Sequence, residues 1–406
     1  MSKITKYALS DLYDMSSGIS SKKEQAGHGA PFVSFGTVFN NYFLPEELPD
    51  LMDTSEKEQE IYSIKAGDVL ITRTSETIDE LAMSCVAVKD YPNATYSGFI
   101  KRLRPKREGI VYPKYMAFYF RSALFRKAVT NNAFMTLRAS FNEDIFTLLE
   151  VHLPDYDEQV RIGDLLYKIE CKIQKNRKIN DYLEEMAKTI YDYWFVQFNF
   201  PDKNDTPYKA SGGNLIYNMP LKKEIPPNWT VDTIGNLLSK VPNSIKIHST
   251  AYCKNGLIPV IDQSSNYIAG YTNDETSILV NPNGYIIFGD HTRIVKYVRF
   301  PFARGADGTQ IIDSNNSNMP NELFYQVIKS IDLSNYGYAR HFKYLKDTVI
   351  AIPPTNLAST YTEKVSKWYK MQVSLMEENM VLCQLRDWLL PILMNGQATI
   401  EDCCDK

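Results

Sequence analysis

Two stretches of this chain, about 199 residues apart, carry the same seven-residue repeat of mostly apolar side chains. The first series is Ile162, Ile169, Asn176, Leu183 and Ile190, and the second is Tyr361, Trp368, Leu375, Leu382 and Leu389. Residues three positions further on are mostly apolar too: Leu165, Ile179, Met186 and Tyr193, then Met371, Leu385 and Ile392. This repeat is typical of the a and d positions along which two long helices pack side by side.

Each repeat lies in a segment that favours one long helix. The segment from Asp157 to Phe195 contains no proline and a single glycine, Gly163. It can therefore stay helical over roughly 58 Å at about 1.5 Å per residue. The second helix is expected from about Ser359 to Met394, with Pro391 breaking it close to its end. A buried Asn176 at an a position would fix register and partner, and a solvent-facing Asn176 at a frayed seam is the alternative.

Each helix follows a block in which strand-like segments alternate with turns, so we expect an internally duplicated, mixed α/β fold. In the first block a helix is expected from Pro113 to Asn131, and a last strand from Phe146 stops at Pro154. The stretch after the first helix is polar and rich in proline and glycine, as in an exposed linker. The expected segments are a first α+β domain (1–154), a first long helix (155–198), a linker (199–226), a second α+β domain (227–354), and a second long helix with the C-terminal tail (355–406).

Composition and missing motifs exclude several classes of function. No apolar run is long enough to span a bilayer and the N-terminus has no hydrophobic signal core, so we expect a cytoplasmic protein with no membrane partner. The cysteines show no C-x-x-C spacing and no two histidines are four residues apart, so we expect reduced thiols and no metal site. The chain also lacks a phosphate-binding loop, a glycine-rich cofactor turn and the (Asn/Asp)-Pro-Pro-aromatic motif of an adenine methyltransferase.

The nearest approach to a catalytic pair is Asp290 beside His291, in the segment GDHTR. A polar loop that follows a strand is a common turn, and no third group completes a catalytic constellation. We therefore expect no catalytic residue in this chain.

Basic residues gather locally although the net charge is −3. Between Lys101 and Arg138 there are ten basic residues and one acidic residue, interleaved with aromatic side chains. Such density can neutralise phosphates where the fold brings the cations to one face. The alternative is that Arg121, Arg126 and Lys127 merely solvate the outside of a helix.

Duplex DNA is gripped by Lys and Arg at phosphates and read by polar side chains at base edges. The DNA-binding candidates of the first domain are Arg73, Lys101, Arg102, Arg104 and Arg138. Those of the second domain are His291, Arg293, Lys296, Arg304, Arg340, His341 and Lys343, with Gln310 beside them. Adjacent strand residues point to opposite faces, so Lys101 and Arg102 cannot both face the duplex.

Several segments resemble a known family when taken together. They are GLIPVIDQSSNYIAGY, IIFGDHTRIVKYVRFPFARGADGTQII and NYGYARHFKYLKDTVIAIPP in the second block, IYDYWFVQF followed by IPPNW, and LRDWLLPILMNG. With them the chain is similar to the specificity (S) subunit of type I DNA restriction–modification systems. The resemblance implies two target-recognition domains, each reading half of a split DNA site, spaced by an antiparallel coiled coil. One departure is that the second helix lacks the Glu158-Gln159 pair of the first.

The resemblance also implies what the chain works with. The partners would be double-stranded DNA, two methyltransferase subunits per chain, and possibly restriction subunits. The chain itself would hold no cofactor, and S-adenosylmethionine, with ATP and Mg if a motor is present, would belong to the partner subunits. One turn of B-DNA is roughly 34–36 Å, so a pair of helices of this length can set two heads about one turn apart.

Two other functions fit part of the sequence. A coiled-coil scaffold that joins proteins without reading DNA would explain the seven-residue repeats but not the basic strips in both blocks. A stand-alone nuclease or hydrolase would need a catalytic constellation that we do not find in the sequence.

Overall fold

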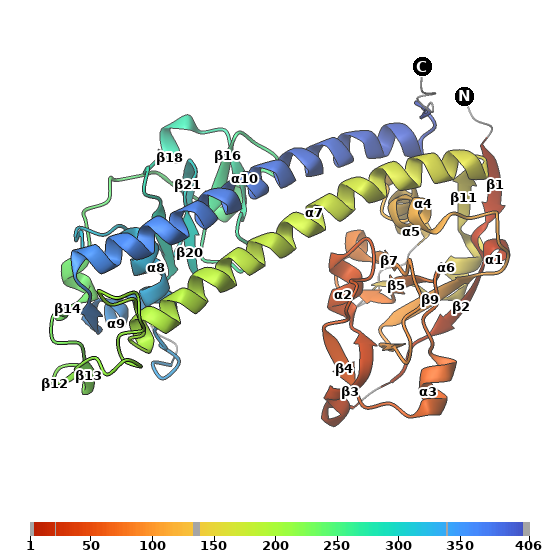
Figure 1. Cartoon of the computed structure of the whole chain (residues 1–406). Coiled ribbons are helices and arrows are strands. Elements are labelled where there is room, and N and C mark those ends of the chain that lie inside the picture. Colours follow the sequence, from red (N-terminus) through yellow and green to blue (C-terminus); the bar gives the residue numbers. More distant parts are fainter. Residues whose placement is uncertain (1–3, 21, 133–138, 338–339, 401–406) are drawn as a thin grey trace, which may run out of the picture. The chain divides into compact units, whose positions relative to one another are not determined.

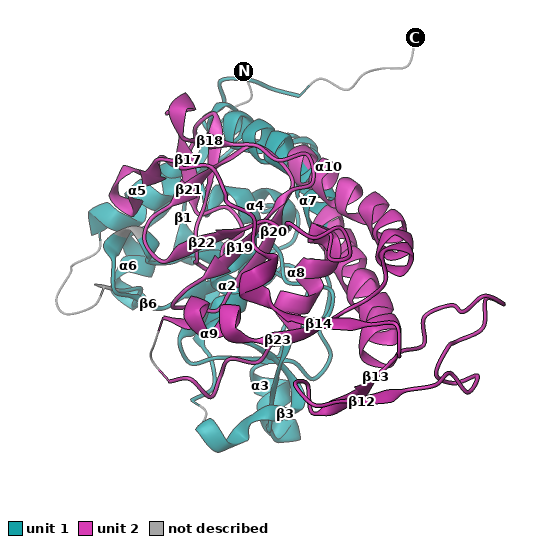
Figure 2. Cartoon of the chain, turned by 90° about the vertical axis from the view of Figure 1, so that its left-hand side faces the viewer, with its two compact units in different colours: residues 1–174, 379–406 teal, residues 175–378 magenta. Residues whose placement is uncertain are grey.

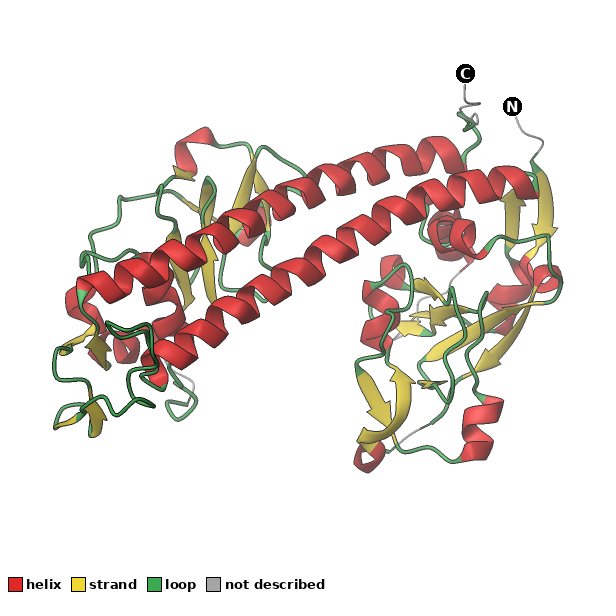
Figure 3. Ribbon diagram, viewed as in Figure 1, coloured by secondary structure: helices red, strands yellow, loops and turns green. Residues whose placement is uncertain are grey.

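The structure is a computed structural model that describes residues 4–20, 22–132, 139–337 and 340–400. It divides into two compact units, which Figure 2 colours separately. Unit 1 comprises residues 1–174 and 379–406, and unit 2 comprises residues 175–378. Each unit combines a block of short strands and helices with a stretch of both long helices, as Figure 3 shows.

Unit 1 is built on a small antiparallel sheet with the strand order β2-β9-β5-β7. Its strands are β2 (Tyr13–Ser17), β5 (Val69–Thr72), β7 (Ser84–Val86) and β9 (Ile100–Pro105). In a second sheet β3 (Ala26–Val33) lies between β4 (Asp50–Met52) and β8 (Thr95–Tyr96), antiparallel to the first and parallel to the second. β1 (Thr5–Ala8) pairs with β11 (Glu150–Leu153) immediately before the first long helix.

Aromatic residues of α4 (Pro113–Tyr119) fill the core of unit 1, together with buried residues of β5 and β9. The remaining helices of this unit include α1 (Leu9–Leu12), α2 (Phe35–Asn40), α3 (Glu56–Ile61), α5 (Ala123–Asn132) and α6 (Glu143–Leu148). The single helix expected from Pro113 to Asn131 is therefore two helices, α4 and α5. Phe146 to Leu148, expected in the last strand, belong to α6.

Unit 2 repeats this plan. Its antiparallel sheet has the order β20-β19-β22, formed by β19 (Tyr285–Gly289), β20 (Val295–Val298) and β22 (Thr309–Ile312). Its second sheet contains β15 (Lys246–Ile247), β16 (Ile258–Ile261), β17 (Gly270–Thr272), β18 (Ile278–Leu279) and β21 (Phe302–Gly305). β14 (Thr230–Thr233) pairs with β23 (Val349–Ile352) before the second long helix. The other helices include α8 (Asn321–Ser330) and α9 (His341–Asp347).

The central strands of the two units correspond in order and direction. β5 lies between β7 and β9 as β19 lies between β20 and β22, and β3 is parallel to β8 as β16 is parallel to β21. The registers agree as well, since Ile71 faces Lys101 and Phe288 faces Gln310. One difference is that the pairing of β2 with β9 shrinks in unit 2 to an isolated bridge between Leu238 and Ser314. The predicted duplication is therefore a duplication of topology.

The first long helix, α7, spans Tyr156–Tyr191 and continues as a short π-helical segment, Asp192–Val196. The second, α10, spans Thr355–Met394 and includes Pro391. The helices pair antiparallel within each unit (Figure 1). In unit 2 Gln372 bonds to the Asn180 carbonyl at 2.9 Å, and in unit 1 Asn379 bonds to the Ile173 carbonyl at 3.3 Å. The expected antiparallel pair of long helices is thus present.

The buried face of α7 differs from the predicted one in its second series. Ile162, Ile169, Asn176 and Leu183 are buried and Ile190 is half-buried. The positions three residues further on were predicted wrongly, since Leu165, Ile179, Met186 and Tyr193 are 36–47% exposed. The core instead uses positions four residues further on, Leu166, Ile173 and Ala187, with Asn180 half-buried. Spacings of three and of four residues both lie close to one helical turn of 3.6 residues, so the apolar pattern alone does not decide which position is buried.

On α10 the buried residues lie near both ends of the helix, at Ala358, Tyr361, Val365 and Tyr369 near the start and at Leu393 and Met394 at the end. The predicted seam residues Trp368, Leu375, Leu382 and Leu389 are half-buried. Met371 and Leu385, predicted at the second series, are 47% and 41% exposed. α10 therefore leaves more of its apolar surface uncovered than its repeat indicates.

Residues 199–226 are more ordered than the plain linker that their composition predicts. They include a hairpin of β12 (Ile216–Asn218) and β13 (Lys223–Ile225). Phe200 stacks on Tyr208 with ring centroids 4.7 Å apart, and Ile225 is buried in the core of unit 2. This segment is part of unit 2.

Candidate nucleic-acid interface

Three loops of unit 1 meet at the ends of its central strands. The Arg73 N–H, just after β5, donates a 2.7 Å hydrogen bond to the carbonyl of Phe99, in the turn between β8 and β9. The Phe141 N–H, just before α6, donates a 2.7 Å hydrogen bond to the Arg73 carbonyl. These three loops, around Arg73, Phe99 and Phe141, are named loop cluster 1.

The same three loops meet in unit 2. The Asp290 N–H, just after β19, donates a 2.8 Å hydrogen bond to the carbonyl of Gly308, between β21 and β22. The His341 N–H, at the start of α9, donates a 2.9 Å hydrogen bond to the Asp290 carbonyl. These loops, around Asp290, Gly308 and His341, are named loop cluster 2. The duplication therefore sets one loop cluster on each unit by the same backbone bonds.

Loop cluster 1 presents two cations on one side. Arg73 is exposed, and the ammonium of the half-buried Lys101 donates a 2.8 Å hydrogen bond to the Ser17 hydroxyl. Burial lowers the pKa of Lys101 and the charge of Arg73 lowers it further, while Glu143 acts in the opposite direction. Lys101 is the register partner of Ile71, two residues before Arg73, and strand residues two positions apart point to the same face. Phe99 is 61% exposed within the same cluster.

Arg102 and Arg104 hold the sheet together from inside unit 1. Arg102 is buried and bonds to the Ser63 carbonyl at 2.5 Å. Arg104 makes a bidentate ion pair with the buried Asp68, at 2.7 and 2.6 Å, and this hydrogen bonding raises the pKa of Arg104. Lys101 and Arg102 thus have different surroundings, as the alternation along a strand requires. Arg138 lies outside the residues that the structure describes.

Loop cluster 2 presents its own exposed basic side chains. They are His291, Arg293, Arg340 and Lys343. The backbone of Arg293 is left-handed, with a φ of 60°, so the loop turns sharply at this residue. The His291 N–H donates a 3.1 Å hydrogen bond to the side-chain oxygen of Gln263, whose amide group donates at 2.8 Å to the Asp307 carbonyl. Gln263 therefore ties two loops of this cluster together.

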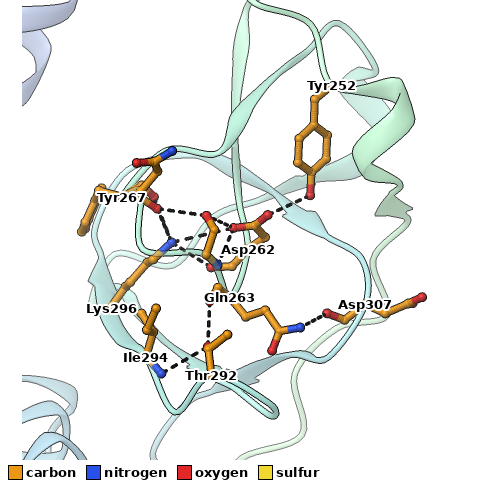
Figure 4. Close-up of polar contacts among 10 residues, drawn as sticks. Tyr252, Asp262, Gln263, Tyr267, Thr292, Ile294, Lys296 and Asp307 are labelled. Atoms are coloured by element: carbon orange, nitrogen blue, oxygen red, sulfur yellow. Dashed lines mark hydrogen bonds and ion pairs between the residues drawn. The ribbon is translucent and has the colours of Figure 1, made fainter. Parts of the chain in front are cut away.

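Lys296 is buried beneath the loop that carries Gln263 (Figure 4), with only 4% of its side chain exposed. Its ammonium donates hydrogen bonds to the carbonyls of Asp262, at 2.8 Å, and Asn266, at 2.5 Å. The Thr292 hydroxyl adds a 2.7 Å bond to the Gln263 carbonyl. Burial lowers the pKa of Lys296 to about 8, although the Asp262 charge opposes this. Lys296 thus holds the loop in place from inside the protein.

Arg304 and His341 are engaged within the fold in the same way. Arg304 donates a 2.8 Å hydrogen bond to the Thr309 carbonyl. His341 is 3% exposed, and its Nδ1 lies 3.0 Å from the Asp290 carbonyl. The Asp290 carboxylate is also buried and accepts a 2.8 Å hydrogen bond from the Phe342 N–H, which gives it a structural role. DNA contact by Arg102, Arg104, Lys296, Arg304 and His341 stays a prediction that this arrangement does not favour.

Sequence reasoning missed Phe99, Gln263 and Thr292, which shape the two loop clusters. The sequence did contain an indication that Phe99 lies in a turn, because it directly follows the turn-forming pair Ser97-Gly98. In the described part of the chain, no group of three or more His, Cys, Asp or Glu side chains is placed to hold a metal ion. None of the described helices is long and apolar enough to cross a membrane.

Comparison with known proteins gives a consistent result. A family model described as the type I restriction modification DNA specificity domain matches residues 1–185. The chain is 23% identical over 408 residues to the type I restriction enzyme MjaIX specificity subunit of Methanocaldococcus jannaschii, covering 94% of this chain and 89% of that one. It is 26% identical over 228 residues to the HindI specificity subunit of Haemophilus influenzae, covering 55% and 46% of the two chains.

A solved structure shares the fold. The S subunit of a type I restriction–modification system from M. genitalium superposes with a TM-score of 0.56 at 13% identity, over 97% of this chain and 96% of that chain. The family model covers residues 1–174 of unit 1 and continues along α7 to residue 185, and unit 2 repeats the central topology of unit 1. The chain is thus similar over nearly its whole length to specificity subunits of type I restriction–modification systems.

Proposed function

We propose that this chain reads a split DNA site, with loop cluster 1 contacting one block of base pairs and loop cluster 2 the other. Specificity subunits of this family are not catalytic, and the chain would direct methyltransferase and restriction partners to the site. The observation that carries the proposal is that the same three loops converge in both units through the same backbone bonds. Duplicated recognition loops account for a site with two specified blocks.

The charges of the two clusters suit a duplex. Arg73 and Lys101 in cluster 1, and Arg293, Arg340 and Lys343 in cluster 2, are exposed or half-exposed and available to phosphates. Because the whole chain has a net charge of −3, attraction to the phosphates of DNA must come from these local basic patches. The loops differ in sequence at corresponding positions, so the two blocks would differ as well. This contact pattern predicts affinity that falls steeply with salt.

Two exposed apolar stripes on the long helices support protein partners. On α10 in unit 1, Val381, Leu385 and Trp388 are 62%, 41% and 63% exposed and lie at i, i+4 and i+7. On α7 in unit 2, Tyr182 and Met186 are 51% and 47% exposed. Tyr182 and Met186 precede Val381 and Leu385 by the same offset of about 199 residues that relates the two repeats.

Side chains of one helical face that are three or four residues apart are neighbours, so each stripe is a continuous apolar ridge. Exposed apolar ridges of this kind mark protein interaction sites. Two related ridges favour two copies of one partner, and we assign one methyltransferase subunit to each. S-adenosylmethionine, and ATP with Mg if a restriction motor is present, would be held by those partners, in the cytoplasm.

A scaffold that joins proteins without reading DNA is the second candidate, and the exposed stripes favour it. It leaves the two loop clusters and their cations without a role. DNA binding by the assembled complex distinguishes the two candidate functions. Salt-independent or absent DNA binding would favour the scaffold.

The test begins with methylation mapping of the host genome with and without this gene, which gives the split motif directly. The chain assembled with its methyltransferase is then titrated with a duplex carrying that motif. Inserting about five base pairs, half a turn, into the spacer is expected to abolish tight binding, because the blocks rotate to opposite faces of the duplex. A duplex with a scrambled spacer of unchanged length is the control and should bind normally. Equal affinity for the half-turn insertion would overturn the proposal.

A further inference from the structure

Phe99 is an exposed aromatic residue on a rigid turn. Its side chain is 61% exposed, whereas Phe118, Phe120 and Phe141 of the same unit are fully buried. The Phe99 N–H donates to the Ser97 hydroxyl at 3.3 Å, and its carbonyl accepts the 2.7 Å bond from Arg73. Both backbone groups of Phe99 are therefore held while its ring faces outward.

The turn that carries Phe99 is packed backbone against backbone. The Gly98 N–H donates a 2.7 Å hydrogen bond to the Ile19 carbonyl, and Ile19 forms a bridge with Ser97. A Cβ at Gly18 would meet the Ser97 carbonyl oxygen at 2.2 Å, so this approach requires glycine. A ring mounted on such a turn can press against a ligand without the turn yielding.

The surroundings of Phe99 point to a duplex as that ligand. Lys101 lies two residues along the chain, and Arg73 is bonded to the Phe99 carbonyl. An apolar side chain between cations fits the alternation of stacked bases and phosphates in DNA. Proteins that distort DNA insert apolar side chains between base steps and anchor the flanking phosphates with Lys and Arg.

We propose that Phe99 is a wedge that enters the base stack of the DNA block read by unit 1, with Arg73 and Lys101 holding the flanking phosphates. This inference rests on the DNA recognition proposed above and adds a distortion to it. Unstacking costs least at pyrimidine–purine steps, so the wedge selects a flexible step of this class within the first block. Phe99 would then contribute specificity through DNA deformability, without hydrogen bonds to base edges.

Unit 2 has no wedge at the corresponding position. Gly308 occupies this position, because its carbonyl accepts the hydrogen bond from the Asp290 N–H as the Phe99 carbonyl accepts that from Arg73. The φ of Gly308 is +73°. A Cβ at Gly308 would meet the Gln263 side-chain nitrogen at 2.7 Å and the His291 ring at 2.8 Å. The residue opposite Phe288 is Gln310, where unit 1 has Lys101 opposite Ile71. The distortion at this position is therefore confined to the first block.

The test uses the chain assembled with its methyltransferase and a duplex carrying the mapped motif. 2-Aminopurine, whose fluorescence rises when its stacking is lost, replaces each adenine of the first or the second block in turn. The wild-type complex is expected to raise the fluorescence several-fold at one step of the first block. Phe99→Ala should remove this rise and weaken binding about ten-fold, which corresponds to about 1.4 kcal/mol. Phe99→Leu keeps an apolar wedge and should retain much of the signal.

Ile61→Ala is the matched control in the same unit. Ile61 is 53% exposed but lies at the end of the acidic helix α3, a poor surface for DNA. This variant should keep both the fluorescence rise and the affinity. Thermal unfolding of each variant checks that the fold is intact.

The outcomes separate the two proposals. A wild-type complex with no affinity for the split-site duplex would refute the proposed function itself. Specific binding without any fluorescence rise in the first block would overturn the wedge alone, as would an unchanged rise with Phe99→Ala. Loss of methyltransferase assembly in Phe99→Ala, with DNA distortion unaffected in the residual complex, would make Phe99 a protein contact and would also overturn it.

Discussion

The side-chain amide of Asn176 on α7 donates a 2.7 Å hydrogen bond to the Glu378 carboxylate on α10. Asn176 is fully buried, so the first of the two environments considered for it in the sequence is the one observed. A polar pair of this kind fits a single alignment of the two helices, because a shift would separate the buried amide from its carboxylate partner. The pair therefore fixes register more than it adds stability.

Asn176→Ala should lower the free energy of unfolding by about 1–3 kcal/mol, because Glu378 loses a charge-assisted hydrogen bond in a partly buried place. Denaturant unfolding of the chain measures this. Replacing both residues by leucine should be nearly neutral for stability, since no polar group is then left buried. An Asn176→Ala variant as stable as the wild type would show that the pair is not part of the packed seam.

The ion pair of Arg386 with Glu170 plays a related role in unit 1. The guanidinium lies 2.8 Å from the carboxylate, with side-chain exposures of 13% and 6%, and also lies over the ring of Tyr42 at 5.0 Å. Arg386→Met leaves Glu170 buried without this partner and should cost about 3–5 kcal/mol. Adding Glu170→Leu should recover most of the loss. Unfolding curves of the single and double variants decide, and equal losses in both would contradict this account.

The exposed stripes predict how the methyltransferase assembles. Leu385→Asp in unit 1 and Met186→Asp in unit 2 should each remove one of two bound methyltransferase subunits, because a carboxylate would be desolvated at the contact. Native mass spectrometry of the complex counts the subunits. Gln384→Asp, one residue away on an exposed position of α10, is the control. Full assembly with both stripe variants would show that the subunits dock elsewhere.

Arg293→Ala should weaken only the second DNA block. The side chain is exposed in loop cluster 2, and loss of one phosphate contact should reduce the salt slope of binding by about 1. Arg293→Lys keeps the charge and should keep the slope. Titrations with duplexes mutated in either block show which block is affected. An equal loss at the first block would mean that the two clusters do not read independently.

The sequence predicted the elements with strong periodicity well, for physical reasons that the helices illustrate. Ile162, Ile169 and Leu183 lie on the buried face because a seven-residue apolar repeat requires a seam whatever its partner. The choice between Leu165 and Leu166 for the next core position depended on the facing helix, which the pattern does not contain. The apolar repeat therefore predicted which face of α7 is buried, but packing against α10 determined which residues lie at the border of that face.

The loop clusters were harder to predict because they depend on contacts between distant segments. Lys296 is a basic residue of the type that contacts DNA, yet its position on β20 directs its side chain beneath the Asp262–Tyr267 loop. Phe99 is a residue type that usually lies in a protein core, yet the turn at Gly98 directs its side chain outward. In both cases the side chain's direction came from backbone pairing, which no single segment of sequence reveals.

The titration of Lys296 provides a test of the loop that it supports. Its folded-state pKa, about 8, lies below the ordinary value of 10.5, because burial disfavours the ammonium. Between these values the folded chain releases this proton while the unfolded chain keeps it. The unfolded state then binds more protons, so this group makes the free energy of unfolding rise with pH across that window. The rise is on the order of 3 kcal/mol at most.

Lysine-selective NMR measures the midpoint directly, with Lys296→Met identifying the resonance and Lys343→Met as the control for losing one exposed charge. We expect a midpoint near pH 8 and a stability difference between wild type and Lys296→Met that grows in favour of wild type above that pH. A midpoint near 10.5 would mean that the carbonyls of Asp262 and Asn266 fully offset the cost of burying the charge.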